Sequence, residues 1–172
     1  MDSFIEYMIQ QKKTAKDIVK QILIYALALF LSLILIAAAF IFIPQFISFT
    51  PMLIALFFFG AYKITSAYNV EYEYILTNGE LDIDKITNRK KRKRLLTVHC
   101  KTFTCFSKVG NPEYKDEENS QFSKVIDARA HSKTYDDYYA IFYINGQKTK
   151  LLFNPTQKMT DVFKIFAPRV VK

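Results

Sequence analysis

Few residues in this chain have side chains that could do covalent or metal chemistry. His99 beside Cys100 suggests a nucleophile with its general base. Neighbours on a strand point to opposite faces, however, so these two could not pass a proton directly. The only other histidine is His131, and the sequence has neither a His-Glu-x-x-His nor a Cys-x-x-Cys motif, so a zinc site lacks ligands. Asp136-Asp137 lies at the mouth of an expected hairpin and indicates turn chemistry.

The cysteines and glycines narrow the chemistry further. If Cys100 and Cys105 lie on one continuous strand, their odd separation points them to opposite faces, which argues against a metal pair. Four glycines in the whole chain leave no Gly-rich phosphate loop. We therefore predict that the protein is not an enzyme and holds no metal or cofactor.

The most conspicuous local feature is a run of six consecutive cations, Arg89, Lys90, Lys91, Arg92, Lys93 and Arg94. Close to an anionic leaflet, each charge that reaches the surface would contribute about 1 kcal/mol of attraction. We take these six residues as a hypothetical contact with anionic membrane lipids. The alternative is that the run only reinforces topology and solubility. A nucleic-acid partner is not predicted, because no recognition motif accompanies the charge.

Two further surface features have simpler explanations. An acidic stretch could pair with the basic run or face a cationic partner, but a solvated loop is favoured; it comprises Glu113, Asp116, Glu117 and Glu118. The tyrosines between Tyr135 and Tyr143 could stack on a ligand. At alternating spacing, packing within a sheet is the favoured interpretation.

Two apolar segments precede the part of the chain that contains these groups. Residues 22–43 contain no charged residue, and at about 1.5 Å per residue they span roughly 33 Å, enough to cross a bilayer. A second helix is predicted over residues 51–68, with Thr50 as its N-cap and Pro51 as its first residue. The alternatives for this second segment are a buried core helix or a re-entrant segment.

The flanking charges predict the orientation of this helical pair. The segment between the helices is uncharged, whereas lysines stand on the outer side of both: Lys12, Lys13, Lys16, Lys20 and Lys63. The positive-inside rule then predicts a multi-pass protein of the inner (cytoplasmic) membrane with both termini in the cytoplasm. In that reducing compartment no disulfide is expected.

The first 20 residues are predicted to be a juxtamembrane segment. Ser3 and Glu6 have the spacing of a capping box. Apolar residues follow on one helical stripe, namely Phe4, Ile5, Met8 and Ile9. These signals predict a short helix on the inner leaflet, and a frayed N-terminus is the equally weighted alternative.

After Tyr68 the periodicity changes from helical to alternating, which indicates an antiparallel β domain over residues 69–172. Asn78-Gly79 joins residues 69–77 to 80–87, and Asn145-Gly146 joins residues 138–144 to 147–153, as type I′ hairpins. Strands are expected near residues 94–106 and 123–130, with a loop over 110–121. A final amphipathic helix would begin with Asn154 as N-cap and Pro155 as its first residue, bury Met159, Val162, Phe163 and Phe166, and end at Pro168.

Six or seven antiparallel strands followed by one helix is the architecture of the pleckstrin-homology superfold. The stretch YEYILTNGELDIDKITNRKKRKRLL resembles the opening of the bacterial pleckstrin-homology-like domain. MDSFIEYMIQQKKTAKD and LLFNPTQKMTDVF are similar to a family of small bacterial membrane proteins with two transmembrane helices and such a domain. The resemblance implies an α+β fold, a transmembrane hairpin over residues 21–68 and a cytoplasmic domain over 69–172. It implies no particular activity.

One departure from eukaryotic relatives of this superfold is expected. Those that bind phosphoinositides take their basic ligands largely from a long loop between the first two strands, and here that loop is predicted to be only Asn78-Gly79. We therefore predict a membrane-anchored, non-catalytic binding or scaffolding module that engages a protein partner or a second copy of itself. The alternative is an anionic-lipid sensor that uses residues 89–94, and an enzyme is the third and weakest possibility.

Overall fold

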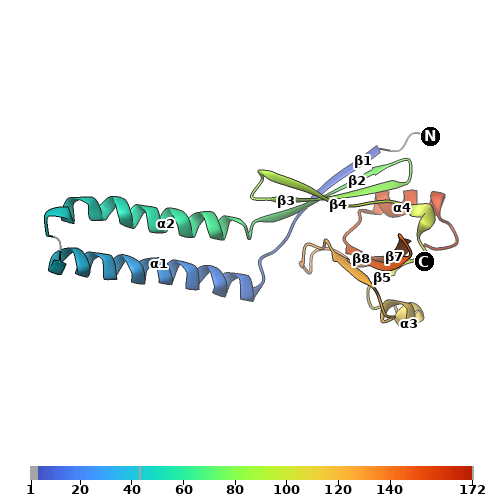
Figure 1. The fold of residues 1–172 in the computed structure, drawn as a ribbon. Coiled ribbons are helices and arrows are strands. Elements are labelled where there is room, and N and C mark those ends of the chain that lie inside the picture. Colours follow the sequence, from blue (N-terminus) through green and yellow to red (C-terminus); the bar gives the residue numbers. More distant parts are fainter. Residues whose placement is uncertain (1–3, 43, 172) are drawn as a thin grey trace. The chain divides into compact units, whose positions relative to one another are not determined.

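The computed structural model describes residues 4–42 and 44–171 of the 172-residue chain. The chain divides into two compact units (Figure 1). One unit consists of residues 13–69. The other combines residues 1–12 with residues 70–172, so both ends of the sequence belong to the same domain.

The first unit is a pair of apolar helices, α1 (Ala15–Phe42) and α2 (Thr50–Ser66), joined by a 3-10 turn, η1 (Pro44–Phe49). Ala28 of α1 and Ala61 of α2 are buried, and Tyr25 Oη lies 3.1 Å from Thr65 Oγ1. Both helices are long and apolar enough to cross a membrane. The prediction that Thr50 caps α2 is wrong. Phe49 is the N-cap, and Thr50 Oγ1 instead donates to the carbonyl of Ile47.

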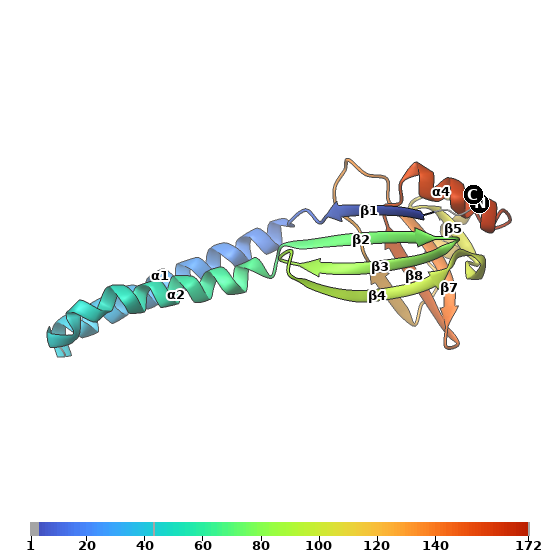
Figure 2. The same cartoon turned by 90° about the horizontal axis from the view of Figure 1, so that it is seen from above.

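The second unit opens with a four-stranded antiparallel sheet in the order β1-β2-β3-β4, seen from above in Figure 2. Its strands are β1 (Phe4–Gln10), β2 (Val70–Thr77), β3 (Glu80–Thr87) and β4 (Lys91–His99). The N-terminal segment is therefore a strand, and the predicted juxtamembrane helix is wrong. The core-facing side chains of this segment are those of Ile5, Tyr7 and Ile9. This every-second-residue pattern fits a strand, although the apolar residues of the segment also fit one helical stripe. Ser3 lies outside the described residues.

Pairing of β1 with β2 changes the topology expected from sequence. Gln10 is opposite Glu71, and the backbone N–H of Gln11 donates to the carbonyl of Val70 at 2.9 Å. The connection between the first two strands of the domain is thus residues 11–69, the whole helical pair with its short linkers. Asn78-Gly79 joins the second strand to the third, so the expected shortness of the first connection is wrong.

A second sheet has the order β5-β7-β8-β6. Its strands are β5 (Cys105–Lys108), β6 (Lys124–Asp127), β7 (Tyr138–Ile144) and β8 (Gln147–Phe153), with β6 parallel to β8. Both predicted hairpins are confirmed. The single strand expected near residues 94–106 is instead β4 and β5, separated by a 3-10 turn, η2 (Cys100–Thr102). The polar loop contains another, η3 (Pro112–Tyr114), and a short helix, α3 (Lys115–Glu118).

The core lies between the sheets and is closed by α4 (Gln157–Phe166). Met159 and Phe163 of this helix are fully buried, as its apolar stripe predicts. The N-cap is Thr156 rather than the predicted Asn154, because the Thr156 hydroxyl accepts from the Met159 N–H. Burial of large aromatic side chains, each worth roughly 1.5–3 kcal/mol, supplies much of the stability of this small domain.

Candidate functional site

The basic run lies at the turn between β3 and β4, at the end of the sheet where β2 begins (Figure 2). A β-bulge between Ile83 and Asp84 shifts the register, so that Ile83 pairs with Leu96 but Asp84 pairs with Arg94. Leu95 is the extra residue. Without this bulge, strict alternation would put Leu96 on the same face as Arg94. The bulge lets arginines face outward while Leu96 packs inward.

The arginines of the run are ion-paired to carboxylates on the outer face of the first sheet. Arg89 Nε lies 3.1 Å from Glu71 Oε1, and Arg92 Nη2 lies 2.6 Å from Glu73 Oε2. Arg94 binds Asp84 through its Nε and binds a second carboxylate, Asp82 Oδ1, at 2.7 Å. Guanidinium groups suit this role, because their planar fork matches a carboxylate. Three of the six predicted lipid-contact residues are therefore ion-paired within the domain.

Glu73 is the most deeply buried member of this face. Its side chain is 2% exposed, whereas that of Arg92 is 55% exposed, so the arginine covers the carboxylate from the solvent side. Burial raises the pKa of Glu73, and the positive charge of Arg92 opposes that shift. The neighbouring carboxylates of Glu6 and Asp84 raise the pKa further, so Arg92 is the group that favours the charged form of Glu73.

The lysines of the run have a different environment. Lys93 pairs across the strands with Lys85, and Lys91 pairs with Thr87, so these side chains share the face opposite to the arginines. Lys90, in the turn, is exposed, as are Lys91 and Lys93. Within residues 4–42 and 44–171, no carboxylate forms an ion pair with any of these four lysines.

The other sequence-predicted cations are divided between the two units. Lys12 belongs to the β domain, where its N–H donates to the carbonyl of Ala130 at 2.7 Å. Lys13, Lys16, Lys20 and Lys63 belong to the helical unit. Among these, Lys63 places its amine 5.3 Å from the centre of the Phe59 ring.

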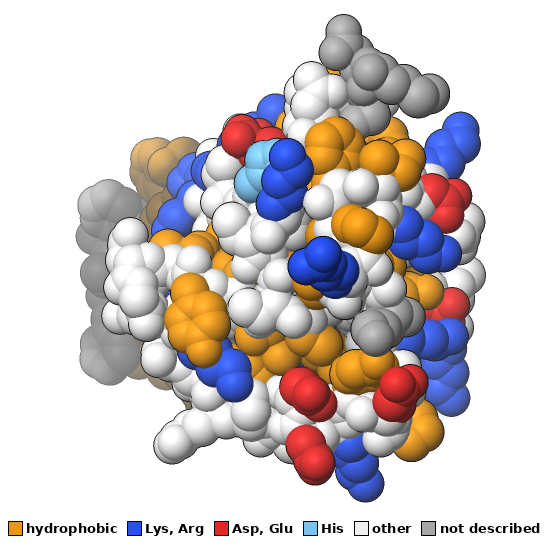
Figure 3. Space-filling model, turned by 90° about the vertical axis from the view of Figure 1, so that its right-hand side faces the viewer, with side chains coloured by type: hydrophobic (Ala, Val, Ile, Leu, Met, Phe, Trp, Pro, Cys, Tyr) orange, Lys and Arg blue, Asp and Glu red, His pale blue; other side chains and the backbone are white. Residues whose placement is uncertain are grey.

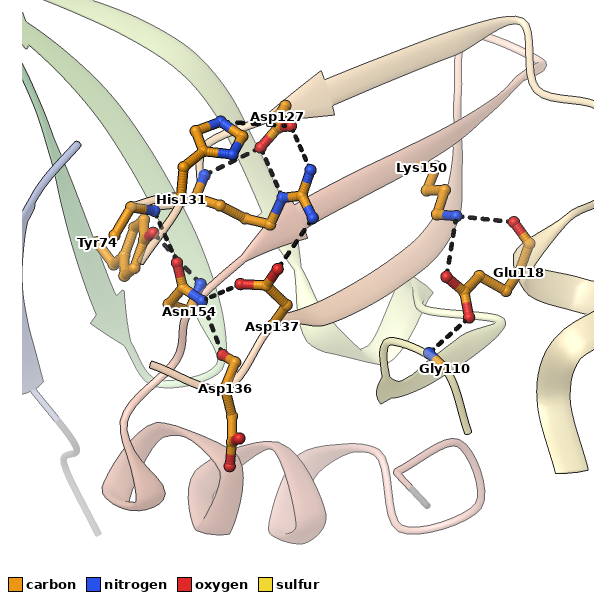
Figure 4. Close-up of polar contacts among 11 residues, drawn as sticks. Tyr74, Gly110, Glu118, Asp127, His131, Asp136, Asp137, Lys150 and Asn154 are labelled. Atoms are coloured by element: carbon orange, nitrogen blue, oxygen red, sulfur yellow. Dashed lines mark hydrogen bonds and ion pairs between the residues drawn. The ribbon is translucent and has the colours of Figure 1, made fainter. Parts of the chain in front are cut away.

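A partly buried polar network fixes the loop between β6 and β7 (Figure 4). Arg129 donates to both oxygens of Asp127, at 2.9 and 2.7 Å, and to Asp137 at 3.0 Å. Asn154 accepts from the Ala130 N–H and donates to Asp137, while Tyr74 donates to the carbonyl of residue 128 at 2.6 Å. Burial alone would raise the pKa of Asp127, but the hydrogen bonds from Arg129 outweigh it and lower the pKa. This network is a structural brace that sequence reasoning missed.

The acidic stretch does not pair with the basic run. Lys150 donates to the backbone carbonyl of Glu118 at 2.7 Å, and the Glu118 carboxylate accepts from the Gly110 N–H at 2.9 Å (Figure 4). The Lys150 amine also lies 5.2 Å from the Tyr139 ring centre, and burial lowers its pKa. These contacts anchor α3 against the second sheet.

The residues with catalytic potential are built into the packing. His99 caps η2 by accepting from the Lys101 N–H, and its ring meets Phe166 edge-on at 6.0 Å between centroids. Cys100 is fully buried, and that burial raises the pKa of its thiol. His131 lies 3.7 Å from Asp127 at the edge of the polar network. In the described part of the chain, no three metal-ligating side chains come together.

The end of the domain opposite to the basic run has a mixed surface and a tyrosine-rich sheet beneath it. Figure 3 shows the end of the domain at the right of Figure 1, where cationic, anionic and apolar side chains are interspersed. Of the tyrosines in the second sheet, Tyr139 is fully buried and Tyr138 stacks on Phe106 with centroids 5.4 Å apart. Their environment fits packing rather than ligand stacking.

Two packed sheets closed by a C-terminal helix are the architecture of a pleckstrin-homology-like domain. Comparison with protein families agrees: the chain matches the family described as Bacterial PH-like domain (DUF6106) over residues 1–172. It belongs to that family. No curated protein and no solved structure matches it. Domains of this class bind lipids or proteins and are generally non-catalytic.

Proposed function

We propose that this protein is a membrane-anchored, non-catalytic binding module that holds its pleckstrin-homology-like domain at the cytoplasmic face of the inner membrane. The observation that carries this proposal is the position of the helical pair, which is inserted between β1 and β2. Only residues 11–14 separate β1 from α1, and only residues 67–69 separate α2 from β2.

Pairing of β1 with β2 supports a two-crossing topology. Hydrogen-bonded strands lie in the same compartment, so the segment between Gln10 and Val70 must cross the membrane an even number of times. The flanking lysines favour the cytoplasm as that compartment. In both helices most large apolar side chains are exposed, including Leu23, Phe30 and Phe59, and hydrocarbon rather than water is the solvent in which that exposure is stable.

Two short linkers restrict the domain to the membrane surface. Residues 67–69 allow a separation of at most about 14 Å between the last residue of α2 and the first of β2. A binding surface held in this way meets membrane-associated partners at high effective concentration. Scaffolding of a protein partner, or of a second copy, is the mechanism we favour. The exposed apolar side chains Phe4, Met8 and Ile165 are the candidate contact points.

Site-specific photo-crosslinking in native membranes tests this proposal. A photoreactive amino acid is placed singly at Phe4, Met8 or Ile165, with Lys158 on the polar side of α4 as the matched control. A discrete adduct of one defined mass from the first sheet or from α4, absent from the control, supports scaffolding. Absence of any discrete adduct at all three positions contradicts it.

A second function is favoured by the unpaired lysines of the β3–β4 hairpin. They make an anionic-lipid sensor the alternative, in which the membrane itself is the ligand. The two functions are separable, because lipid contact depends on the hairpin whereas the candidate protein contacts lie on β1 and α4.

A further inference from the structure

We propose that Lys85, Lys90, Lys91 and Lys93 form the anionic-lipid contact of this domain, and that the arginines of the same run do not take part. This inference rests on the proposed membrane anchoring and assigns the ligand and its residues. It also adds Lys85, which lies outside the basic run.

Strand alternation places the two kinds of cation on opposite faces of the first sheet. Arg92 and Arg94 point to the face that carries Glu73 and Asp84, and each has a carboxylate within ion-pair distance. Lys91 and Lys93 point to the other face. The carboxylates therefore compensate the arginine charges, whereas the lysines have no carboxylate partner among the described residues.

The face of the sheet that carries the lysines has unrelieved like-charge repulsion. Lys85 and Lys93 are direct cross-strand neighbours, and like charges in that position destabilise a sheet. The carboxylates Glu73 and Asp84 lie on the other face of the same strands, and no carboxylate of the described residues forms an ion pair with Lys85 or Lys93. An anionic surface would relieve the repulsion, which is the chemistry expected of a site that binds external phosphate groups.

The position of the lysines in the chain also favours a contact with the membrane. Thr87, the last residue of β3, pairs with Val70, which follows α2 by a linker of residues 67–69. The lysines therefore belong to the end of the sheet that is covalently closest to the membrane segments. Lysine also suits a fluid lipid surface, because its compact, hydrated ammonium needs no fixed geometry, whereas arginine favours fixed bidentate partners.

The test is amine footprinting of the full-length protein in lipid nanodiscs. A neutral amine-reactive reagent labels exposed lysines, and mass spectrometry gives a labelling rate for each position. Discs of phosphatidylcholine alone are compared with discs containing phosphatidylglycerol, at low salt and at 1 M NaCl. Lys158 and Lys164 on α4 serve as internal references.

We expect the labelling rates of the four lysines to fall about fivefold or more in anionic discs, relative to the references, and to recover at 1 M salt, where the Debye length is about 3 Å. Equal rates in both kinds of disc would overturn the inference. Protection in neutral discs as well would also overturn it, because it would indicate a protein or steric cover rather than attraction to charge.

One triple variant separates this inference from the proposed function. Lys85→Gln/Lys91→Gln/Lys93→Gln should abolish the anionic-disc protection of Lys90 while photo-crosslinking from Phe4, Met8 or Ile165 persists. Persistent protection of Lys90 in that variant would refute the lysine assignment. Loss of the crosslinks in the wild type, with lysine protection intact, would instead refute scaffolding and leave the lipid contact standing.

Discussion

Replacement of Arg92 by glutamine tests whether the arginines of the basic run are structural. Glu73 would remain buried at 2% exposure without its cation. Removal of one member of a buried ion pair costs about 3–5 kcal/mol. Arg92 is half-exposed and Glu73 can take up a proton, so we expect a smaller loss of roughly 2 kcal/mol in the stability of the first sheet.

Hydrogen exchange of the full-length protein in detergent measures this loss. A destabilisation of roughly 2 kcal/mol speeds exchange of the β2 and β3 amides about 30-fold if they exchange through cooperative opening. Lys93→Gln is the matched control, one residue away on the opposite face. It should leave exchange unchanged or slow it slightly, because it removes the repulsion with Lys85.

A double variant decides whether the cost comes from the unpaired carboxylate. Glu73→Leu/Arg92→Met removes both charges and should restore slow exchange, since an apolar pair replaces a buried ion pair at little cost. Equal effects of Arg92→Gln and Lys93→Gln, or a double variant as unstable as the single one, would refute the assignment of Arg92 to structure.

Three further predictions follow from the same contacts. In Arg92→Gln, the loss of stability relative to the wild type should shrink between pH 7.5 and 5.5. Burial raises the pKa of Glu73, so the folded state binds the Glu73 proton at higher pH than the unfolded state and gains stability as the pH falls. Hydrogen exchange corrected for intrinsic rates measures this change. Gly79→Ala should destabilise the domain by about 1–3 kcal/mol more than Gly146→Ala in denaturant titrations, because both have positive φ but only the Gly79 Cβ would lie 2.9 Å from Phe166. Residues 69–172 alone should aggregate in size-exclusion chromatography because the edge of β2 is uncovered, whereas residues 4–12 joined by a tight turn to 70–172 should elute as a monomer.

The elements predicted correctly are those with local signals. Asn78 and Asn145 have φ values of 51° and 49°, the left-handed conformation that the Asn-Gly hairpins require, and a short turn leaves little choice of partner strand. The apolar stripe of α4 likewise identified its buried face. These features depend on residues within a few positions of each other.

The errors lie where a partner is distant in sequence. Residues 4–9 fit a helical stripe and an alternating strand equally well, and the choice was made by β2, which lies beyond the whole helical pair. The environment of each cation in the basic run likewise depends on strand pairing that the local sequence does not reveal. Six cations in a row look equivalent in sequence, and the bulge at Leu95 with the register of β3 decides which have carboxylate partners. The alternating Arg-Lys order of residues 91–94 was the available signal.

In the proposed topology, a membrane hairpin is inserted between two hydrogen-bonded strands of one domain. Disulfide trapping in native membrane vesicles tests it most directly, with Glu6→Cys/Ile75→Cys as the paired positions and Glu6→Cys/Thr77→Cys as the diagonal control. We predict rapid intramolecular crosslinking of the paired variant upon mild oxidation and much slower crosslinking of the control. Absence of an intramolecular crosslink in the paired variant, or equal rates in both, would contradict the inserted topology.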